Sequence, residues 1–190
     1  MRYPAAETAE KHQRILDEAT RLFRDRGFDG VNISEIMKSA GLTHGSFYNH
    51  FESKNDLISS CIVHGATTSL ANVDAVEPSA AGKKAYVDEY LSVAHRDDPG
   101  SGCLMSALAS EVRREPLAKG AMTRFVHAFV EKLAVRFPWQ KPRSARRDAI
   151  RATAAMVGGL MLARAVNDEE FSLEILREVA DGLKESFRES

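Results

Sequence analysis

Apolar residues recur at helical intervals between sharp turns, and this pattern limits what the chain can fold into. Over residues 5–26, Ile15, Ala19, Leu22 and Phe23 recur at spacings of three and four, while charged residues occupy the other side. Clusters of proline, glycine and asparagine divide the rest of the chain into further segments of this kind. Because no stretch shows the two-residue alternation of a strand, we predict an all-α fold of about nine helices.

Two capping signals define the second and fourth of these helices. Asn32 stands three residues before Glu35, so each side chain can bond a backbone N–H that the first helical turn leaves unsatisfied. This second helix ends at Gly41, because glycine readily adopts the positive φ of a helix C-terminus. Ser53 stands three residues before Asp56 and starts a long fourth helix in the same way. The N-terminal third of the chain is therefore expected to hold four helices.

Residues 41–51, GLTHGSFYNHF, supply the third helix of this prediction, with Thr43 as its cap. A spacing of four puts Phe47 and Phe51 on one face, where they can pack against the preceding helices. The other side presents donors, acceptors and one ring, from His44, Gly45, Tyr48 and Asn49. A helix, a tight turn and a second helix with a polar outer face form the helix-turn-helix arrangement, which inserts its second helix into the major groove of DNA.

Gly45 has two interpretations. Glycine within a helix costs about 1 kcal/mol relative to alanine, so its presence here indicates a benefit. A missing side chain in the first turn lets the backbone approach a phosphate, which the N-terminal end of a helix attracts. The alternative is that Gly45 occupies a first turn that tolerates glycine.

The run from residue 15 to residue 58 resembles the N-terminal DNA-binding domain of the tetracycline-repressor (TetR) family. The family's signature of an aromatic pair, a histidine and another apolar residue is matched by Phe47, Tyr48, His50 and Phe51. The lysine just beyond this signature corresponds to Lys54. The resemblance implies a DNA-binding domain over residues 1–53, with the helix-turn-helix at about 32–51. It also implies that residues 54–190 form a ligand-binding and dimerisation domain.

The resemblance further implies a role for each residue of the recognition helix. Tyr48 and Lys54 would contact phosphates, which positions the protein without reading sequence. Base edges would be read by its polar residues, since Asn49 can pair with adenine and His44 can donate to guanine. His50 would bond within the domain or to a phosphate, or else read a base. The expected DNA-binding set is Ser34, Thr43, His44, Gly45, Ser46, Phe47, Tyr48, Asn49, His50 and Lys54.

Two apolar stripes follow one another near the C-terminal end. Such helices can form a four-helix bundle with their symmetry mates, and the pair Gly158 and Gly159 allows close approach. The expected dimer interface consists of Ile150, Ala154, Val157, Gly158, Met161, Leu176, Val179, Leu183 and Phe187. The alternative is that both stripes face only the chain's own core. The family resemblance favours a homodimer, whose two recognition helices match the half-sites of a palindromic operator.

The middle of the chain contains candidates for an apolar ligand cavity. They are Cys103, Met105, Met122, Phe125, Phe129, Trp139 and Met156, and ordinary core packing is the alternative for most of them. The stretch GCLM at 102–105 resembles a segment in a branch of the TetR family that includes sensors of reactive electrophiles. Cys103 is then either a sensor thiol or a small buried residue, while Cys61 belongs to the core. The implied effector is a small apolar or electrophilic molecule whose binding releases DNA.

Charge gives no general reason to expect nucleic acid. The formal net charge is -1, and the first 60 residues hold eight Lys or Arg and nine Asp or Glu. We therefore expect DNA binding to depend only modestly on salt. Two widely separated cysteines, with no signal-peptide pattern and no apolar run of bilayer length, indicate a soluble protein of the reducing cytoplasm.

An enzyme and a protein-binding adaptor are the competing functional classes. The six histidines form no HExxH or other metal-binding pair, and no glycine-rich phosphate loop follows a strand. We therefore expect no catalytic residue, metal or cofactor. A helical adaptor would use Phe47 and Tyr48 to bind a protein and would lack sequence-specific affinity for duplex DNA. The sequence favours a ligand-responsive transcriptional regulator, for which repression is the family's usual mode and activation the alternative.

Overall fold

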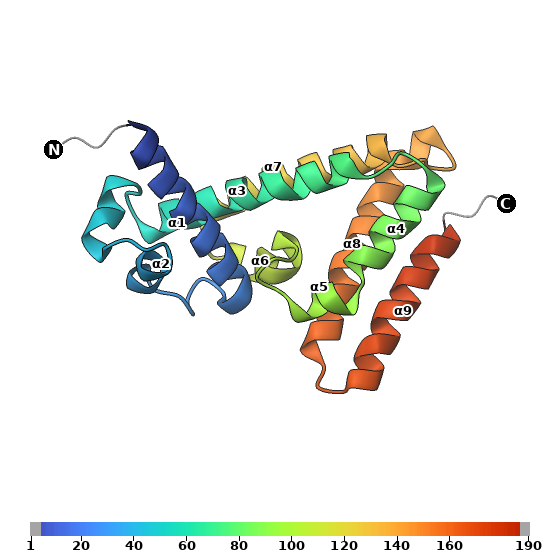
Figure 1. The fold of residues 1–190 in the computed structure, drawn as a ribbon. Helices are drawn as coiled ribbons and strands as arrows, with labels where there is room; N and C mark the ends of the chain where they lie inside the picture. The colour runs from blue at the N-terminus through green and yellow to red at the C-terminus, as the bar shows by residue number, and fades with distance from the viewer. Residues whose placement is uncertain (1–4, 187–190) are drawn as a thin grey trace.

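The computed structural model describes residues 5–186, and over that range the chain forms nine α-helices, two short 3-10 helices and no strand (Figure 1). The prediction of an all-α fold is therefore confirmed. The α-helices are α1 (Ala5–Arg26), α2 (Ile33–Ser39), α3 (Lys54–Ala75), α4 (Ala80–Tyr90), α5 (Val93–Asp97), α6 (Leu104–Val112), α7 (Pro116–Arg136), α8 (Ala145–Ala165) and α9 (Glu169–Ser186). The 3-10 helices are η1 (His44–Asn49) and η2 (Pro142–Ser144).

Helices α3 and α7 pack along each other and form a bar that joins the two ends of the molecule (Figure 1). At one end, α1 packs on α3 and α2, and α2 packs on η1. At the other end, α8 packs on α7 and α9, and α4 contacts both α8 and α9. Helix α6 lies below the bar and contacts α1, α7 and α8. Helices α3 and α6 therefore connect the N-terminal helices to the rest of the molecule.

One half of each predicted capping pair is present at the second and fourth helices, whereas the Glu35 carboxylate accepts from Arg26 and the Asp56 carboxylate from the backbone N–H of Glu52. The side-chain oxygen of Asn32 accepts from the backbone N–H of Glu35 at 2.9 Å, and Ser53 Oγ accepts from that of Asp56 at 3.1 Å. Gly41 follows α2 with a φ of +70°, as expected for a glycine that ends a helix. The sequence therefore defines the ends of α2 and the start of α3.

The segment after Gly41 differs from the α-helix expected over 43–51. It forms the six-residue 3-10 helix η1, and the Thr43 side chain makes no capping bond. The carbonyl of Thr43 instead accepts from the backbone N–H of Ser46 at 3.1 Å and from its hydroxyl at 2.7 Å. The cap prediction was wrong because so short a segment closes through bonds between residues three apart, to which a serine hydroxyl contributes.

One continuous apolar core runs through both ends of the molecule. Phe23 and Ile36 are fully buried at the N-terminal end, as are Leu133 and Leu160 at the other. Cys61 of α3 is buried in this core, as predicted. Within residues 5–186, no helix has an apolar stretch long enough to span a membrane.

Candidate nucleic-acid interface and ligand cavity

The inner side of η1 is buried, whereas its outer side is exposed. Phe47 has no exposed surface, and its ring centroid lies 5.7 Å from that of the buried Phe51. Tyr48 is 64% exposed. The exposed residues, which we call the outer flank, are His44, Gly45, Tyr48 and Asn49. The expected burial pattern is therefore present, while the DNA contacts themselves stay a prediction.

Internal hydrogen bonds orient the polar residues around the outer flank. Ser34 Oγ of α2 lies 2.9 Å from His44 Nδ1, so this bond joins the two halves of the helix-turn-helix. Because Nδ1 has a partner, Nε2 of His44 is the ring nitrogen left for a molecule outside the chain. Ser46 donates its hydroxyl hydrogen to the Thr43 carbonyl, so Ser46 Oγ retains its capacity to accept.

His50 and Lys54 contact the rest of the N-terminal region. His50 is half-buried, with its ring centroid 5.7 Å from that of His12. Burial lowers the pKa of His50, with smaller contributions from His12 and Lys11, and this favours the neutral ring. Lys54 Nζ donates to the carbonyl of Phe28 at 2.6 Å, which ties the start of α3 to the turn after α1.

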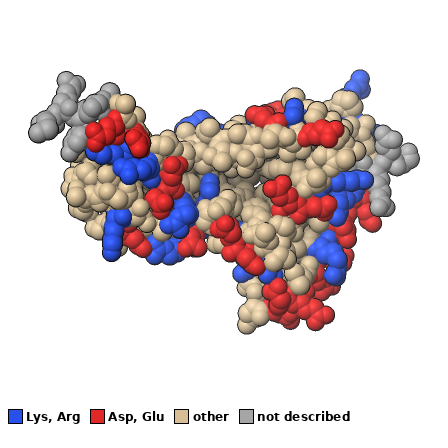
Figure 2. Space-filling view, in the orientation of Figure 1, with Lys and Arg blue, Asp and Glu red and all other residues tan. Residues whose placement is uncertain are grey.

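Basic and acidic side chains are interspersed over this end of the molecule (Figure 2). The ion pairs in this region are Arg26–Glu35, Lys11–Glu7 and Arg21–Glu18. Arg14 and Lys38 are exposed and have no ion pair with any residue in the described range. Pairing therefore reduces the number of cations that are free to meet phosphates.

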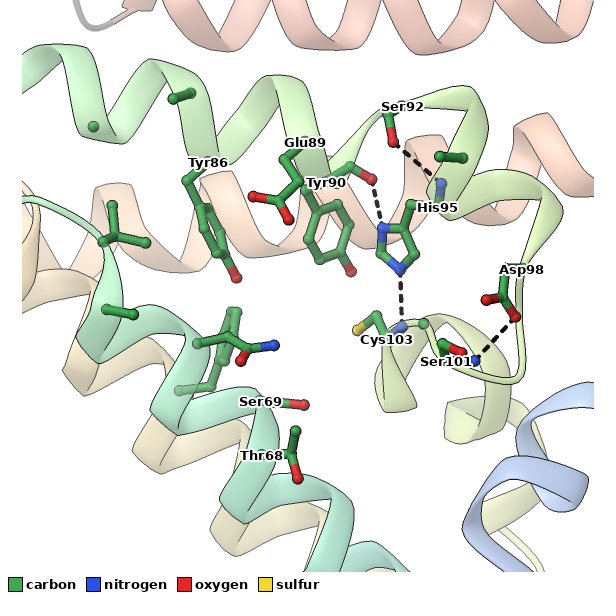
Figure 3. Close-up of a pocket in the computed structure, with 18 of the residues that line it drawn as sticks. Thr68, Ser69, Tyr86, Glu89, Tyr90, Ser92, His95, Asp98, Ser101 and Cys103 are labelled. Atoms are coloured by element: carbon green, nitrogen blue, oxygen red, sulfur yellow. Dashed lines mark hydrogen bonds between the residues drawn. The ribbon is translucent and has the colours of Figure 1, made fainter. Parts of the chain in front are cut away.

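A cavity of about 680 Å³ lies between α3, α4 and the segment that runs from α5 to the start of α6 (Figure 3). This volume falls within the usual range for small-molecule sites. Thr68 and Ser69 of α3 face the two tyrosines of α4 across the cavity (Figure 3). Arg24 reaches the lining from α1, so the cavity also borders the N-terminal region.

His95 connects α4 to the start of α6 beside this cavity. Its Nε2 accepts from the backbone N–H of Cys103 at 2.9 Å, and its Nδ1 lies 2.7 Å from the Tyr90 carbonyl (Figure 3). Because a backbone N–H can only donate, the proton of the neutral ring belongs on Nδ1. Burial lowers the pKa of His95, which agrees with a neutral ring. This part of the cavity wall is therefore fixed by hydrogen bonds.

The predicted ligand residues are divided between the cavity and the core. Cys103 and Phe129 line the cavity. The others lie elsewhere: Met105, Met122, Phe125 and Met156 are buried in the core, and Trp139 stacks on Lys83. Lining residues that the sequence did not predict include Tyr86, Glu89, Tyr90 and His95. The sequence signal that could have indicated them is the spacing of Tyr86 and Tyr90, since residues four apart lie on the same face of a helix.

Residues 15–61 match the profile of the bacterial regulatory proteins of the tetR family. AcrR from Shigella flexneri, an HTH-type transcriptional regulator, is 47% identical over 53 residues, which are 28% of this chain and 25% of AcrR. Residues 15–61 therefore carry the DNA-binding segment of the tetR family. Because the match spans about a quarter of the length of this curated relative, the sequence likeness concerns only the N-terminal part of the chain.

Solved structures resemble the chain over nearly its whole length. The reduced form of NemR from E. coli matches with a TM-score of 0.79 at 20% identity, covering 94% of this chain and 97% of NemR. A TetR-family transcriptional regulator from Agrobacterium tumefaciens matches with a TM-score of 0.77 at 18% identity, covering 94% and 98%. At these identities, the likeness shows a shared fold beyond residues 15–61.

The chain exposes an apolar strip on α8. Ile150 is 47% exposed, Ala154 and Met161 are also exposed, and a Cβ added at Gly158 would meet open space. Of the other predicted interface residues, Val157, Val179 and Leu183 are half-buried, Leu176 is buried in the chain's own core, and Phe187 lies outside the described residues. The α8 stripe is therefore open to a partner, whereas much of the α9 stripe packs internally.

Proposed function

We propose that the chain is a DNA-binding transcriptional regulator that binds a palindromic operator as a homodimer. The observation that carries this proposal is the outer flank of η1, which stands exposed on a fully buried Phe47 within the segment that matches the tetR family. A short helix held through one face is suited to enter the major groove with the other. We place the protein in the cytoplasm and assign it no catalytic step and no cofactor.

Within this proposal, base reading and phosphate contact fall to different side chains. Asn49 pairs with adenine, and His44 donates from Nε2 to guanine. Tyr48 and Lys54 contact phosphates, assisted by the hydroxyls of Ser34 and Thr43. Lys54 already donates to Phe28, but an ammonium group carries three donors and can bond a phosphate as well.

The proposed dimer forms through the exposed strip on α8. Leu162 is 59% exposed, so it continues the apolar surface beyond Met161. Phe171, which is 48% exposed on the neighbouring helix α9, adds an aromatic side chain to the apolar residues at the α9 end of the fold. Two chains related by a two-fold axis would present recognition helices to half-sites about one helical turn, or roughly 34 Å, apart.

The division into residues 1–53 for DNA binding and 54–190 for dimerisation and ligand binding belongs to the same proposal.

Ligand binding would act on DNA affinity through α3. Lys54 starts this helix beside η1, and Thr68 of the same helix lines the cavity. A ligand that separates α3 from α4 would tilt α3 and change the spacing of the two recognition helices in the dimer. Such coupling requires a ligand with different affinities for the two arrangements. We expect ligand binding to release DNA.

Helix α6 supplies a second connection between the cavity and the N-terminal region. Cys103 at its start lines the cavity, and the Glu111 carboxylate near its end accepts from the backbone N–H of Phe28 at 2.6 Å. The carbonyl of Phe28 accepts from Lys54. A shift of α6 would therefore reach the turn after α1 and the start of α3 together.

The electrophile alternative depends on Cys103, a half-buried free cysteine in the cavity lining. Cys61 offers a matched control, because burial raises the pKa of its thiol to about 12 and keeps it protonated. If the effector is an electrophile, Cys103→Ser should abolish release of DNA by a quinone or a maleimide, and Cys61→Ser should not. An unchanged response in Cys103→Ser would exclude this mode of sensing.

Selection of bound sequences from random duplex DNA by the purified chain tests the proposed function. We expect a palindrome whose half-sites are about one helical turn apart. Recovery of unselected sequences, together with capture of a protein partner through Tyr48, would favour the adaptor class. Catalytic turnover without operator binding would favour an enzyme.

A further inference from the structure

The charges that line the cavity sum to a negative value. The carboxylates are Glu77, Glu89 and Asp98, and the one guanidinium in the lining is that of Arg24. His95 is uncharged when its Nε2 accepts the bond from Cys103. Acidic side chains also gather over α4, beside the hollow under the α3–α7 bar (Figure 2). A cavity with this balance attracts cations and repels anions.

Arg24 leaves the α4 side of the cavity negative. Its Nη1 donates to the carbonyl of Gly100 at 3.2 Å, and the side chain approaches from α1. Glu89 belongs to α4, and Glu77 lies in the turn that precedes α4. The one positive group of the lining therefore belongs to another element than these carboxylates; its Nη1 is bonded, while its Nε is buried without a hydrogen-bond partner in the described range.

Glu89 has the surroundings of a cation-binding carboxylate. Its side chain lies between the rings of Tyr86 and Tyr90 (Figure 3). Asp98 Oδ1 accepts from the backbone N–H of Ser101 at 3.2 Å, whereas the exposed carboxylate of Glu89 makes no hydrogen bond or ion pair with any residue in the described range. A carboxylate flanked by two aromatic rings offers charge and π surface to the same ligand group.

The hydroxyl of Tyr90 is a second, independent indication of a ligand. Tyr90 is 7% exposed, and its Oη is buried without a well-formed hydrogen bond in the part of the chain that the structure describes; the thiol of Cys103, a weak partner, is the side chain that interacts with it. Native proteins rarely leave a buried hydroxyl unpaired. Burial raises the pKa of Tyr90 well above its ordinary value, so the hydroxyl stays protonated and can donate.

We propose that the cavity binds an amphipathic organic cation, whose ammonium group lies against Glu89 and beside the neighbouring rings of Tyr86 and Tyr90, whose centroids are 6.3 Å apart. The carboxylate supplies the opposite charge, and the rings supply cation–π attraction. An oxygen atom of the ligand accepts from the Tyr90 hydroxyl, and its apolar part packs on Phe129. This inference names the effector class of the cavity and therefore rests on the effector role proposed above.

Calorimetric titration of the full chain, without DNA, tests the charge preference. The probes are 1-naphthylmethyl-trimethylammonium and 1-naphthylacetate, which share a ring system and differ in charge. We expect the cation to bind at least about tenfold more tightly than the anion, and Glu89→Gln to remove most of that difference. Asp88→Asn is the matched control, since Asp88 pairs with Lys184 outside the cavity lining and its loss should leave both affinities unchanged.

The aromatic contribution is tested at Tyr86. Tyr86→Phe keeps the ring and should bind the cation like the original chain, whereas Tyr86→Leu should weaken binding severalfold. Tighter binding of the anion, absence of cation binding by the folded chain, or an unchanged cation affinity in Glu89→Gln would overturn the proposal.

These outcomes are separable from those of the operator selection. A chain that selects a palindrome but prefers naphthylacetate would retain the proposed function and lose this inference. A chain that binds the cation through Glu89 but selects no DNA sequence would retain the binding site and lose its role as an effector site.

Discussion

The recognition segment and the cavity use similar side chains but are assembled differently. The recognition segment is one run, residues 41–51, whose exposed tyrosine, histidine and asparagine stand on buried phenylalanines of the same run. The cavity takes its tyrosines, histidine and carboxylates from parts of the chain between Arg24 and Phe129. Local spacing therefore determines the recognition segment, whereas tertiary packing determines the cavity. Substitutions in the recognition segment should therefore distinguish effects on stability from effects on DNA binding better than substitutions in the cavity distinguish stability from ligand binding.

The largest expected effect comes from Phe47→Ala. Phe47 has no exposed surface, and removing its ring should lower the free energy of unfolding by about 3–5 kcal/mol. Tyr48→Ala, one residue away on the exposed side, should change it by less than about 0.5 kcal/mol. Chemical denaturation followed by circular dichroism measures both. Equal losses of unfolding free energy in the two variants would show that the exposed side of η1 contributes as much to stability as the buried side.

Among substitutions that lower stability, Gly27→Ala should have the next largest effect, at the junction of the two regions. Gly27 has a φ of +74°, and a Cβ there would overlap the Glu111 carboxylate. The strain should lower the free energy of unfolding by about 1–3 kcal/mol. Gly45→Ala is the control, because its Cβ would meet open space and its φ is not positive. A stable Gly45→Ala with weakened DNA binding would favour close approach to a phosphate over the tolerant-turn interpretation.

Lys83, which lies outside the recognition segment, should make the stability of the folded chain depend on pH. Its Nζ donates to the Pro138 carbonyl at 3.1 Å and lies 3.6 Å from the centroid of the Trp139 ring. Burial lowers the pKa of Lys83 to about 8 from its ordinary 10.5, although Asp148 opposes the shift. Between these pH values the unfolded chain holds the proton more tightly, so stability should rise with pH.

The expected rise between pH 8 and pH 10.5 is about 3 kcal/mol. Lys83→Met should remove this part of the pH profile, and Lys84→Met, at the neighbouring position, should keep it. Denaturation of all three proteins across this range provides the measurement. A profile that Lys83→Met leaves unaltered would contradict a lowered pKa in the folded state.

The smallest expected effect is the salt dependence of DNA binding. Ion pairs occupy Arg26, Lys11 and Arg21, so few cations are available to displace counterions. The slope of log affinity against log salt should therefore be well below the value of about 9 expected for ten phosphate contacts. Fluorescence anisotropy at several salt concentrations measures it, and a slope near 9 would be incompatible with this charge arrangement.

The sequence predicts the N-terminal region well because its signals are local. The caps at Asn32 and Ser53 and the burial of Phe47 each depend on residues within a few positions of one another. The 3-10 geometry of η1 was missed because Ser46 competes for the carbonyl of Thr43, which a helical pattern does not reveal.

The cavity could not be predicted in the same way. Apolar residues such as Met122 and Met156 suggested a lining, but residues of this kind fill the core first. Glu89 and His95 border the cavity because α4, α5 and α6 meet there, and no spacing in the sequence encodes that meeting. The face of α8 left open by α9 likewise depends on how the last two helices pack.

The central claim is that the outer flank of η1 meets DNA, with Asn49 reading a base and Tyr48 holding a phosphate. Its most direct test is the operator selection repeated with Asn49→Ala and Tyr48→Ala. Asn49→Ala should relax the sequence preference at one position in each half-site, a loss of about 1–3 kcal/mol of discrimination. Tyr48→Ala should weaken binding to all sequences while leaving the selected palindrome unchanged. Unaltered affinity and specificity in both variants, each shown to be folded, would contradict the account.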